Sequence, residues 1–316
     1  MAKAPADQLR DGVTILDKEA GWTSHDVVAK ARGILRNKKI GHSGTLDPDA
    51  TGVLVLGIGK ATKVLRFLTA LPKTYVGEIA LGVETSTLDA SGEITRTHDM
   101  AHITPEQVRK AAESLTGDIL QIPPMVSAVK IDGQRLYQLA RKGLEIERPA
   151  RPVTVYRFLI EPVVGEPGIY RAEVDCSSGT YVRTLAADIG EALGGGAHLR
   201  SLRRTAIGSF NVEDATTLDD IEVLPAREAL RDYPAIIVRG DVVNAVRSGR
   251  QLDYAVLGIP LGVLPPAAGI GSVPAAVDNG PWAVLDEKGE LLAVYEHHRG
   301  MSAKPSVVLP SGTTQK

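Results

Sequence analysis

The chain has 316 residues, 43% of them hydrophobic and 23% charged, which is enough for one large domain or for a large domain and a small one. A net charge of −2 argues against a protein that coats nucleic acid non-specifically, although it is compatible with a local basic face. The single cysteine, Cys176, excludes an intrachain disulfide and a multi-cysteine zinc site. No run of about 18 apolar residues predicts a membrane helix, and the N-terminus has no apolar signal core, so we expect a cytoplasmic protein.

The first hundred residues predict alternating strands and helices. After a loose tail at 1–10, we expect a strand at 12–17 and a helix with Ser24 as its N-cap. The end of that helix carries a basic run that contains Arg32, Arg36, Lys38 and Lys39. A polar, glycine-rich loop, GHSGTLDPDATG (41–52), then precedes an apolar strand, a helix near 61–71 and a strand at 73–83.

The next segment continues this mixture. Thr104 followed by Pro105 predicts the start of a helix that ends near residue 115. We expect a loop-rich stretch at 121–134, a short helix at 136–143, strands at 153–163 and 169–177, and an amphipathic helix at 181–193. Strands and helices do not alternate strictly, which indicates the α+β class.

The composition changes after about residue 235. A Pro/Gly/Ala-rich stretch without helical or strand periodicity is flanked by short strand candidates at 235–238, 282–286 and 291–297. The segment WAVLDEKGELLAVYE predicts a β-hairpin. We therefore expect a small β-rich domain over 236–310 and a tail at 311–316.

Three segments suggest chemistry. GIGKAT (57–62) follows a strand and opens a helix, but it fits neither a dinucleotide fingerprint nor a Walker A loop. The cluster Glu296-His297-His298 alternates faces on a strand, which favours a solvated strand end over a metal site. The loop 41–52 contains Asp47 before Pro48, which restricts Asp47 to an extended backbone. Taken alone, this pattern is typical of a turn as well as of a catalytic loop.

Six ordered segments between residues 11 and 210 resemble the TruB-type pseudouridine synthases. They are DGVTILDKEAGWTS, GHSGTLDPDATGVLVLGIGKATK, KTYVGEIALGVETSTLDASG, PPMVSAVKIDGQRLYQLARKG, CSSGTYVRTLAADIG and GGGAHLRSLRRTAIGSF. The chain departs from the family pattern at Glu19, where a proline is usual, and at the charged Asp49, where an apolar residue is expected.

The resemblance implies a pseudouridine-synthase fold with a central, mainly antiparallel sheet over 11–235. It also implies an RNA-gripping insertion near 121–152 and a PUA-like RNA-binding domain over 236–310. The implied reaction converts the uridine at position 55 of the tRNA T-loop to pseudouridine after the base is flipped out of the RNA stack. The reaction needs no metal and no nucleotide or other cofactor, and we expect a monomer whose partner is tRNA.

The resemblance also implies roles for individual residues. Asp47 is the catalytic aspartate, and Arg183 lies beside it and keeps it ionised. Implied substrate contacts are base stacking for Tyr75, the uracil pocket for Tyr181 and Leu202, displaced nucleotides for His42, and RNA or pocket support for Lys18 and Lys130. Expected phosphate contacts are the basic run 30–39, Arg141, Lys142, Arg148, Arg151, Arg200, Arg203 and Arg204.

Simpler interpretations remain open from the residues alone. Tyr75 would then be a cross-strand packing residue, and Arg183 a surface partner of Asp188. At the level of the whole protein, the alternatives are a non-catalytic tRNA-binding protein or folding chaperone, a relative that acts on another RNA, and a nucleotide-binding enzyme.

Overall fold

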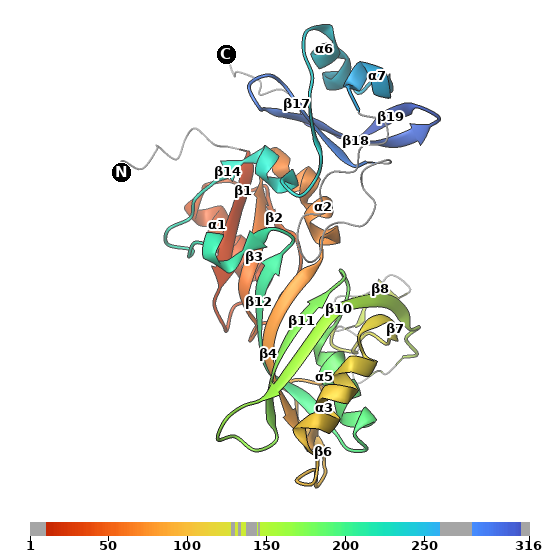
Figure 1. Cartoon of the computed structure of the whole chain (residues 1–316). Helices are drawn as coiled ribbons and strands as arrows, with labels where there is room; N and C mark the ends of the chain where they lie inside the picture. The colour runs from red at the N-terminus through yellow and green to blue at the C-terminus, as the bar shows by residue number, and fades with distance from the viewer. Residues whose placement is uncertain are drawn as a thin grey trace.

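The computed structural model describes residues 11–127, 130–131, 134–136, 144, 146–259 and 280–310. A ten-stranded sheet organises the larger part of the molecule, and a five-stranded sheet organises the C-terminal part (Figure 1). The predicted helix at 136–143 lies almost wholly outside the described residues. Of the insertion expected near 121–152, the structure describes a short pair of strands, β8 (Lys130–Ile131) and β9 (Gln134–Arg135).

The large sheet has the order β14-β1-β3-β12-β4-β11-β10-β7, with β2 beside β3 and β13 beside β12. Its strands are β1 (Gly12–Lys18), β2 (Ile40–His42), β3 (Thr51–Ile58), β4 (Lys73–Leu81), β7 (Gly117–Gln121), β10 (Arg151–Pro162), β11 (Ile169–Cys176), β12 (Ala197–Ile207), β13 (Phe210–Asn211) and β14 (Leu224–Pro225). Among these strands only β3 and β12 pair in parallel. The predicted mainly antiparallel sheet is therefore confirmed.

Helices cover both faces of this sheet. They are α1 (Ser24–Ile34), η1 (Gly59–Val64), α2 (Leu65–Ala70), α3 (Pro105–Ser114), α5 (Val182–Ala192), η2 (Val212–Asp214) and η3 (Ala226–Leu230). The N-cap prediction for α1 is wrong by one residue, because Thr23 caps the helix and forms a capping box with Asp26. Ser24 is the first helical residue, and its hydroxyl binds elsewhere.

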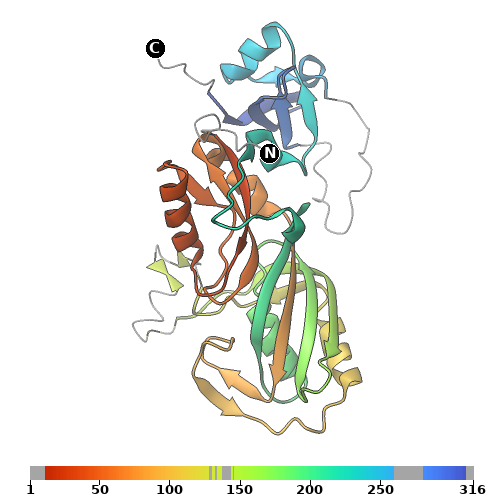
Figure 2. The ribbon, with the colours of Figure 1, turned by 90° about the vertical axis from the view of Figure 1, so that its left-hand side faces the viewer.

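The apolar sequence of β3 follows from burial on both faces. Val53 and Val55 pack in the core that contains α2 and η3, whereas Leu54 and Leu56 pack against α1. A separate core lies at the other end of the sheet, where α3 and α5 cover β4, β10, β11 and β12 (Figures 1 and 2). The long strands β4 and β12 connect the two ends.

The C-terminal sheet contains the predicted β-hairpin, formed by β17 (Trp282–Leu285) and β18 (Leu291–Arg299). Its other elements are β15 (Ala235–Ile237), α6 (Asp241–Arg247), β16 (Leu252–Asp253), α7 (Tyr254–Leu257) and β19 (Ser302–Val308). The two sheets share a core, because Ala283 and Val294 pack with Phe67 and Leu68 of α2.

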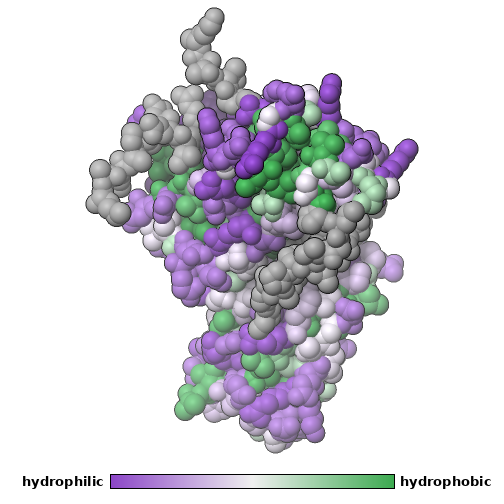
Figure 3. Space-filling view, turned by 45° about the horizontal axis from the view of Figure 1, so that its top comes forward, coloured by the Kyte–Doolittle hydropathy of each residue, from purple (hydrophilic) through white to green (hydrophobic). Residues whose placement is uncertain are grey.

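The face of the molecule seen in Figure 3 is mostly hydrophilic, and its largest hydrophobic patches lie on the upper part. The exposed hydrophobic side chains of the C-terminal part include Ile237, Val256 and Met301. None of the helices in the described part of the chain is long and apolar enough to cross a membrane. One more hairpin, β5 (Val83–Thr85) with β6 (Ile94–Thr97), had no counterpart in the sequence prediction.

Candidate active site

Asp47 lies in a loop, residues 43–50, that connects β2 to β3, and we call this segment the Asp47 loop. Hydrogen bonds to two helices hold the first half of this loop. The Ser24 hydroxyl of α1 accepts from the Leu46 amide at 2.9 Å and donates to the Leu46 carbonyl at 3.2 Å. From α2, the Thr69 hydroxyl donates to the Ser43 carbonyl at 2.8 Å. The loop is therefore held in one conformation before any substrate binds.

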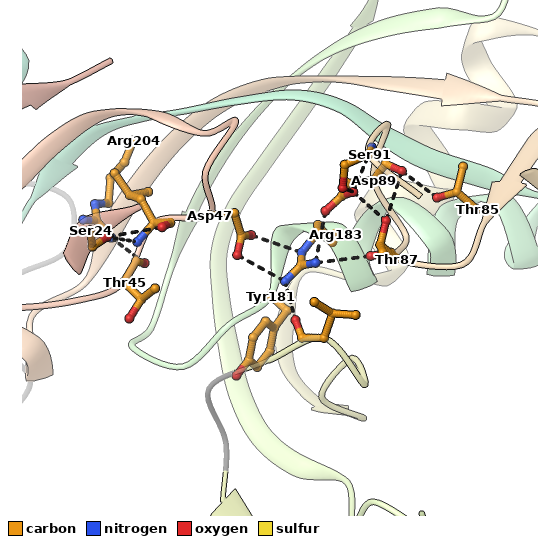
Figure 4. Close-up of polar contacts among 12 residues, drawn as sticks. Ser24, Thr45, Asp47, Thr85, Thr87, Asp89, Ser91, Tyr181, Arg183 and Arg204 are labelled. Atoms are coloured by element: carbon orange, nitrogen blue, oxygen red, sulfur yellow. Dashed lines mark hydrogen bonds and ion pairs between the residues drawn. The ribbon is translucent and has the colours of Figure 1, made fainter. Parts of the chain in front are cut away.

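Two buried cations, Lys18 and Arg204, donate hydrogen bonds to main-chain carbonyls of the same loop and of neighbouring residues. The Lys18 ammonium, on a residue that is 2% exposed, donates to the carbonyls of Glu19, Trp22 and Pro48 at 2.9, 2.6 and 2.9 Å. Arg204, 1% exposed, donates to the carbonyls of Val53 and Gly44 at 2.8 and 3.2 Å and to the carbonyl of Thr45 at 3.5 Å. Figure 4 shows Arg204 next to Thr45. The predicted phosphate contact of Arg204 is wrong, because its guanidinium is enclosed. The three protons of Lys18 are all donated to carbonyls, which favours pocket support over RNA contact.

Replacing Lys18 with methionine should destabilise the protein. Three carbonyls would lose a charged donor, and a buried acceptor without a partner costs about 1–3 kcal/mol. Because such losses are not additive, we expect the free energy of unfolding to fall by roughly 3 kcal/mol, measured in urea. Lys38→Met, at an exposed position near the end of α1, is the control and should leave that free energy unchanged. An equal effect of both substitutions would contradict this role of Lys18.

Asp47 and Asp89 both contact Arg183, whose side chain is only 6% exposed. The Asp47 carboxylate is 3.2 Å from Nε and 3.5 Å from Nη2, and the Asp89 carboxylate is 3.0 Å from Nη1 (Figure 4). Arg183 also donates to the carbonyls of Val126 and Thr87 at 2.9 and 3.3 Å. The interpretation of Arg183 as a surface partner of Asp188 is therefore wrong.

The two carboxylates differ in their surroundings and hence in their pKa. Burial raises the pKa of Asp89, but hydrogen bonds from Ser91 and Thr87 and the charge of Arg183 outweigh it, so the net pKa lies below 3.8. Burial also raises the pKa of Asp47, and here the opposing charge of Arg183 is too weak, so the net pKa lies above 3.8. Asp89 is thus the firm counter-ion of Arg183, whereas Asp47, whose side chain is 42% exposed, is the more available group.

This difference predicts an acid limb in the pH profile. If the carboxylate of Asp47 is the active form, kcat/KM falls as the pH drops through a value above 3.8. A second carboxyl, Asp188, has a pKa that burial raises to about 6 and serves as the control. We expect Asp188→Asn to keep the limb. A limb that disappears in Asp188→Asn would show that the titration belongs to Asp188.

Tyr75, Leu202 and Arg204 lie on one face of the large sheet. Tyr75 of β4 is directly opposite Arg204 of β12, and Gly77 is opposite Leu202. A side chain at position 77 would place its Cβ 2.4 Å from the Ser201 carbonyl, so a glycine allows the two strands to approach here. Burial raises the pKa of Tyr75, and the charge of Arg204 opposes this effect only in part.

His42 and Tyr181 approach the site from two other elements. His42 ends β2, and its Nδ1 accepts from the Gly44 amide at 3.3 Å. Burial and the charge of His25 lower the pKa of His42 below 6.5, so its ring is neutral near pH 7. Tyr181 precedes α5, and the Gln121 side chain binds its amide at 2.7 Å and its carbonyl at 3.1 Å. Lys130 begins β8, and its side chain lies outside what the structure describes.

The sequence prediction missed two residues of this site: Asp89, which binds Arg183, and Gln121, which fixes Tyr181. It named Arg204 only as a phosphate contact and did not predict that Arg204 binds the Asp47 loop. Of these residues, only Asp89 lies in a sequence pattern that could have revealed it. Thr87 and Ser91 lie two residues before and after it, where their hydroxyls can donate to its carboxylate.

The segments considered for nucleotide binding, GIGKAT (57–62), and for metal binding, Glu296-His297-His298, contain side chains that contact other parts of the protein. Lys60 of GIGKAT pairs with Asp11 at 3.3 Å. Glu296 is 3.7 Å from Arg66, and the His297 ring binds the Tyr254 hydroxyl. In the described ranges no group of three or more His, Cys, Asp or Glu side chains is placed to hold a metal ion.

Comparison with known proteins gives consistent matches. The TruB family pseudouridylate synthase N-terminal domain matches residues 32–182, and the tRNA pseudouridylate synthase B C-terminal domain matches residues 183–236. The tRNA pseudouridine synthase B of Streptomyces coelicolor is 44% identical over 308 residues, covering 94% of this chain and 97% of the relative. The protein of the same name from Bacillus anthracis is 42% identical over 304 residues, covering 91% and 93%.

Two solved structures match almost the whole chain. A Cbf5-Nop10-Gar1 complex contains a chain with a TM-score of 0.70 and 27% identity, covering 98% of this chain and 88% of that one. An H/ACA RNP bound to a substrate RNA containing 2'-deoxyuridine contains another, with a TM-score of 0.69 and 25% identity, covering 98% and 89%.

Proposed function

The chain belongs to the TruB family of pseudouridylate synthases, which isomerise uridine in tRNA, and we propose that its target is the uridine at position 55 of the T-loop. The observation that carries this proposal is Asp47, presented by a fastened loop and paired with the buried Arg183. Relatives named tRNA pseudouridine synthase B that align over nearly the whole chain support tRNA as the substrate.

In the proposed reaction the Asp47 carboxylate attacks the ribose or the base, or assists departure of the uracil. The bond between the ribose and N1 of uracil breaks, the uracil turns in place, and its C5 forms the new bond to the ribose. A proton leaves C5, and a proton is gained at N1. Electrons and heavy atoms balance without an oxidant, a reductant or a transferred group.

Each of the other site residues has a proposed role in holding the flipped nucleotide. Tyr75 stacks on the uracil, a contact worth on the order of 1–3 kcal/mol. Tyr181 and Leu202 line the uracil pocket, and the neutral ring of His42 contacts nucleotides that the flipped base displaces. Arg183 aims Asp47, and Asp89 holds Arg183 in turn.

We propose that further RNA contacts come from the segment near 121–152, which contains Lys130, and from the PUA-like C-terminal domain. We propose a monomer as the working unit. The alternative of a non-catalytic tRNA-binding protein has no support among the relatives, whose names are those of enzymes.

Mapping the modified position tests this function. An unmodified tRNA transcript is incubated with the protein, and pseudouridine is located by carbodiimide treatment and primer extension. We expect a stop that reports position 55 and none in a transcript with cytidine there. A stop at another uridine of the wild-type transcript would overturn the T-loop assignment.

A further inference from the structure

His25 is an exposed imidazole beside the Asp47 loop. It follows Ser24 in the first turn of α1, and the Ser24 hydroxyl binds both the amide and the carbonyl of Leu46, the residue before Asp47. The capping box at the start of α1 fixes the same turn. The side chain of His25 therefore starts from an anchored main chain next to the residue that carries the proposed chemistry.

A second contact places the ring of His25 against the ring of His42. The ring centroids are 5.3 Å apart, and the ring planes meet at 77°. His42 is the last residue of β2, immediately before the Asp47 loop, so α1 contacts this part of the chain at two points. Two nearly perpendicular rings form a corner, in which a flat base can stack on one ring and turn its edge towards the other.

Both rings keep nitrogen atoms free for a ligand. The Nδ1 of His42 accepts from the Gly44 amide, so the neutral ring carries its proton on Nε2, a donor that has no partner among the described residues. Within the described ranges His25 likewise has no hydrogen bond and no ion pair. The neighbouring carboxylate of Asp26 instead accepts from the amide and the hydroxyl of Thr23.

We propose that His25 is a further substrate contact, and that it and His42 together hold one nucleotide of the T-loop that the flipped uridine displaces. This inference rests on the proposed function, because that function assigns the displaced nucleotides to His42. In this role His25 touches the RNA and not the reacting atoms, so its loss weakens tRNA binding and spares the chemical step. Because His25 is exposed, its removal leaves no cavity in the core, and the fold should survive.

The first measurement compares the tRNA dissociation constant, from filter binding, with the single-turnover rate of tritium release at saturating tRNA. For His25→Ala we expect the dissociation constant to rise at least about fivefold, because stacking on a base contributes substantially to RNA binding. The rate at saturation should stay within about threefold of the wild type. His102→Ala removes an exposed imidazole from the loop between β6 and α3, and this matched control should change neither quantity.

A double variant tests whether the two rings hold the same nucleotide. With His42 already replaced by alanine, His25→Ala should raise the dissociation constant by less than about twofold, because the shared nucleotide is no longer held. Independent effects that simply multiply would contradict a shared nucleotide.

Diethyl pyrocarbonate footprinting of the wild-type protein tests the contact itself. The reagent acylates accessible imidazole nitrogens, and mass spectrometry measures each histidine separately. We expect saturating tRNA to abolish the acylation of His25 and to leave His102 as reactive as in the free protein.

The outcomes are distinguishable. A wild-type protein that releases no tritium would refute the proposed function. With an active wild type, an unchanged dissociation constant for His25→Ala, or acylation of His25 that tRNA does not reduce, would overturn the contact. Equal protection of His25 and His102 would also overturn it, because the RNA would then cover the surface without a specific site between the two rings.

Discussion

Asp47→Asn should lower the rate of pseudouridine formation by at least about 1,000-fold, because loss of the catalytic carboxylate leaves only the contributions of binding. Asparagine has nearly the same shape, and Arg183 keeps its ion pair with Asp89 at 3.0 Å, so the fold of the site should survive. The dissociation constant for tRNA should change by less than about threefold. Primer extension after a single turnover and filter binding measure the two quantities.

The same loop provides a matched control for this substitution. Asp49 lies two residues from Asp47, is exposed, and forms no hydrogen bond or ion pair with the rest of the described chain. Asp49→Asn makes the same chemical change and should keep nearly the full rate. A comparable loss in both variants would mean that the charge of the loop, and not the Asp47 carboxylate itself, is required.

Arg183→Met should impair both stability and catalysis. Removal of one partner of a buried ion pair costs about 3–5 kcal/mol, and the partial exposure of Asp47 favours the lower end of that range. The pKa of Asp47 should rise further, because the charge of Arg183 is the main effect that opposes burial. We therefore expect a lower rate near neutral pH and an acid limb that lies at higher pH than in the wild type.

Urea unfolding and the pH dependence of kcat/KM measure these effects. Arg109→Met is a suitable comparison, since Arg109 also forms a short ion pair, with Glu161 at 2.8 Å, but the two side chains are 40% and 66% exposed. A pair at the surface is worth about 0–1 kcal/mol, so this variant should be only slightly destabilised. An unchanged acid limb in Arg183→Met would contradict the proposed control of Asp47.

The fold class and most elements were predictable because they follow from local patterns. Thr104 and Pro105 start α3 as expected, and the apolar run of β3 reflects its burial on both faces. The central strand β12 was not predicted, because its arginines interrupt the apolar alternation. The partners that permit Arg204 there are carbonyls of a loop far away in the sequence, and no local pattern reveals them.

The site shows the same division. Asp47 and Arg183 could be proposed from motifs, but the role of Asp89 as the counter-ion of Arg183 depends on a contact across 94 residues of chain. The choice between Thr23 and Ser24 as the cap of α1 also depends on tertiary structure, because the Ser24 hydroxyl is occupied by Leu46. Local propensity alone slightly favours serine over threonine at this position.

The central claim is that the protein isomerises uridine in tRNA and needs the Asp47 carboxylate to do so. Tritium release from a tRNA transcript labelled at C5 of uridine tests it most directly. Wild type and Asp47→Ala are compared without added metal or nucleotide. We predict release by the wild type and none by Asp47→Ala, with tRNA still bound by both proteins. Release by Asp47→Ala at the wild-type rate, or no release by either protein, would contradict the account.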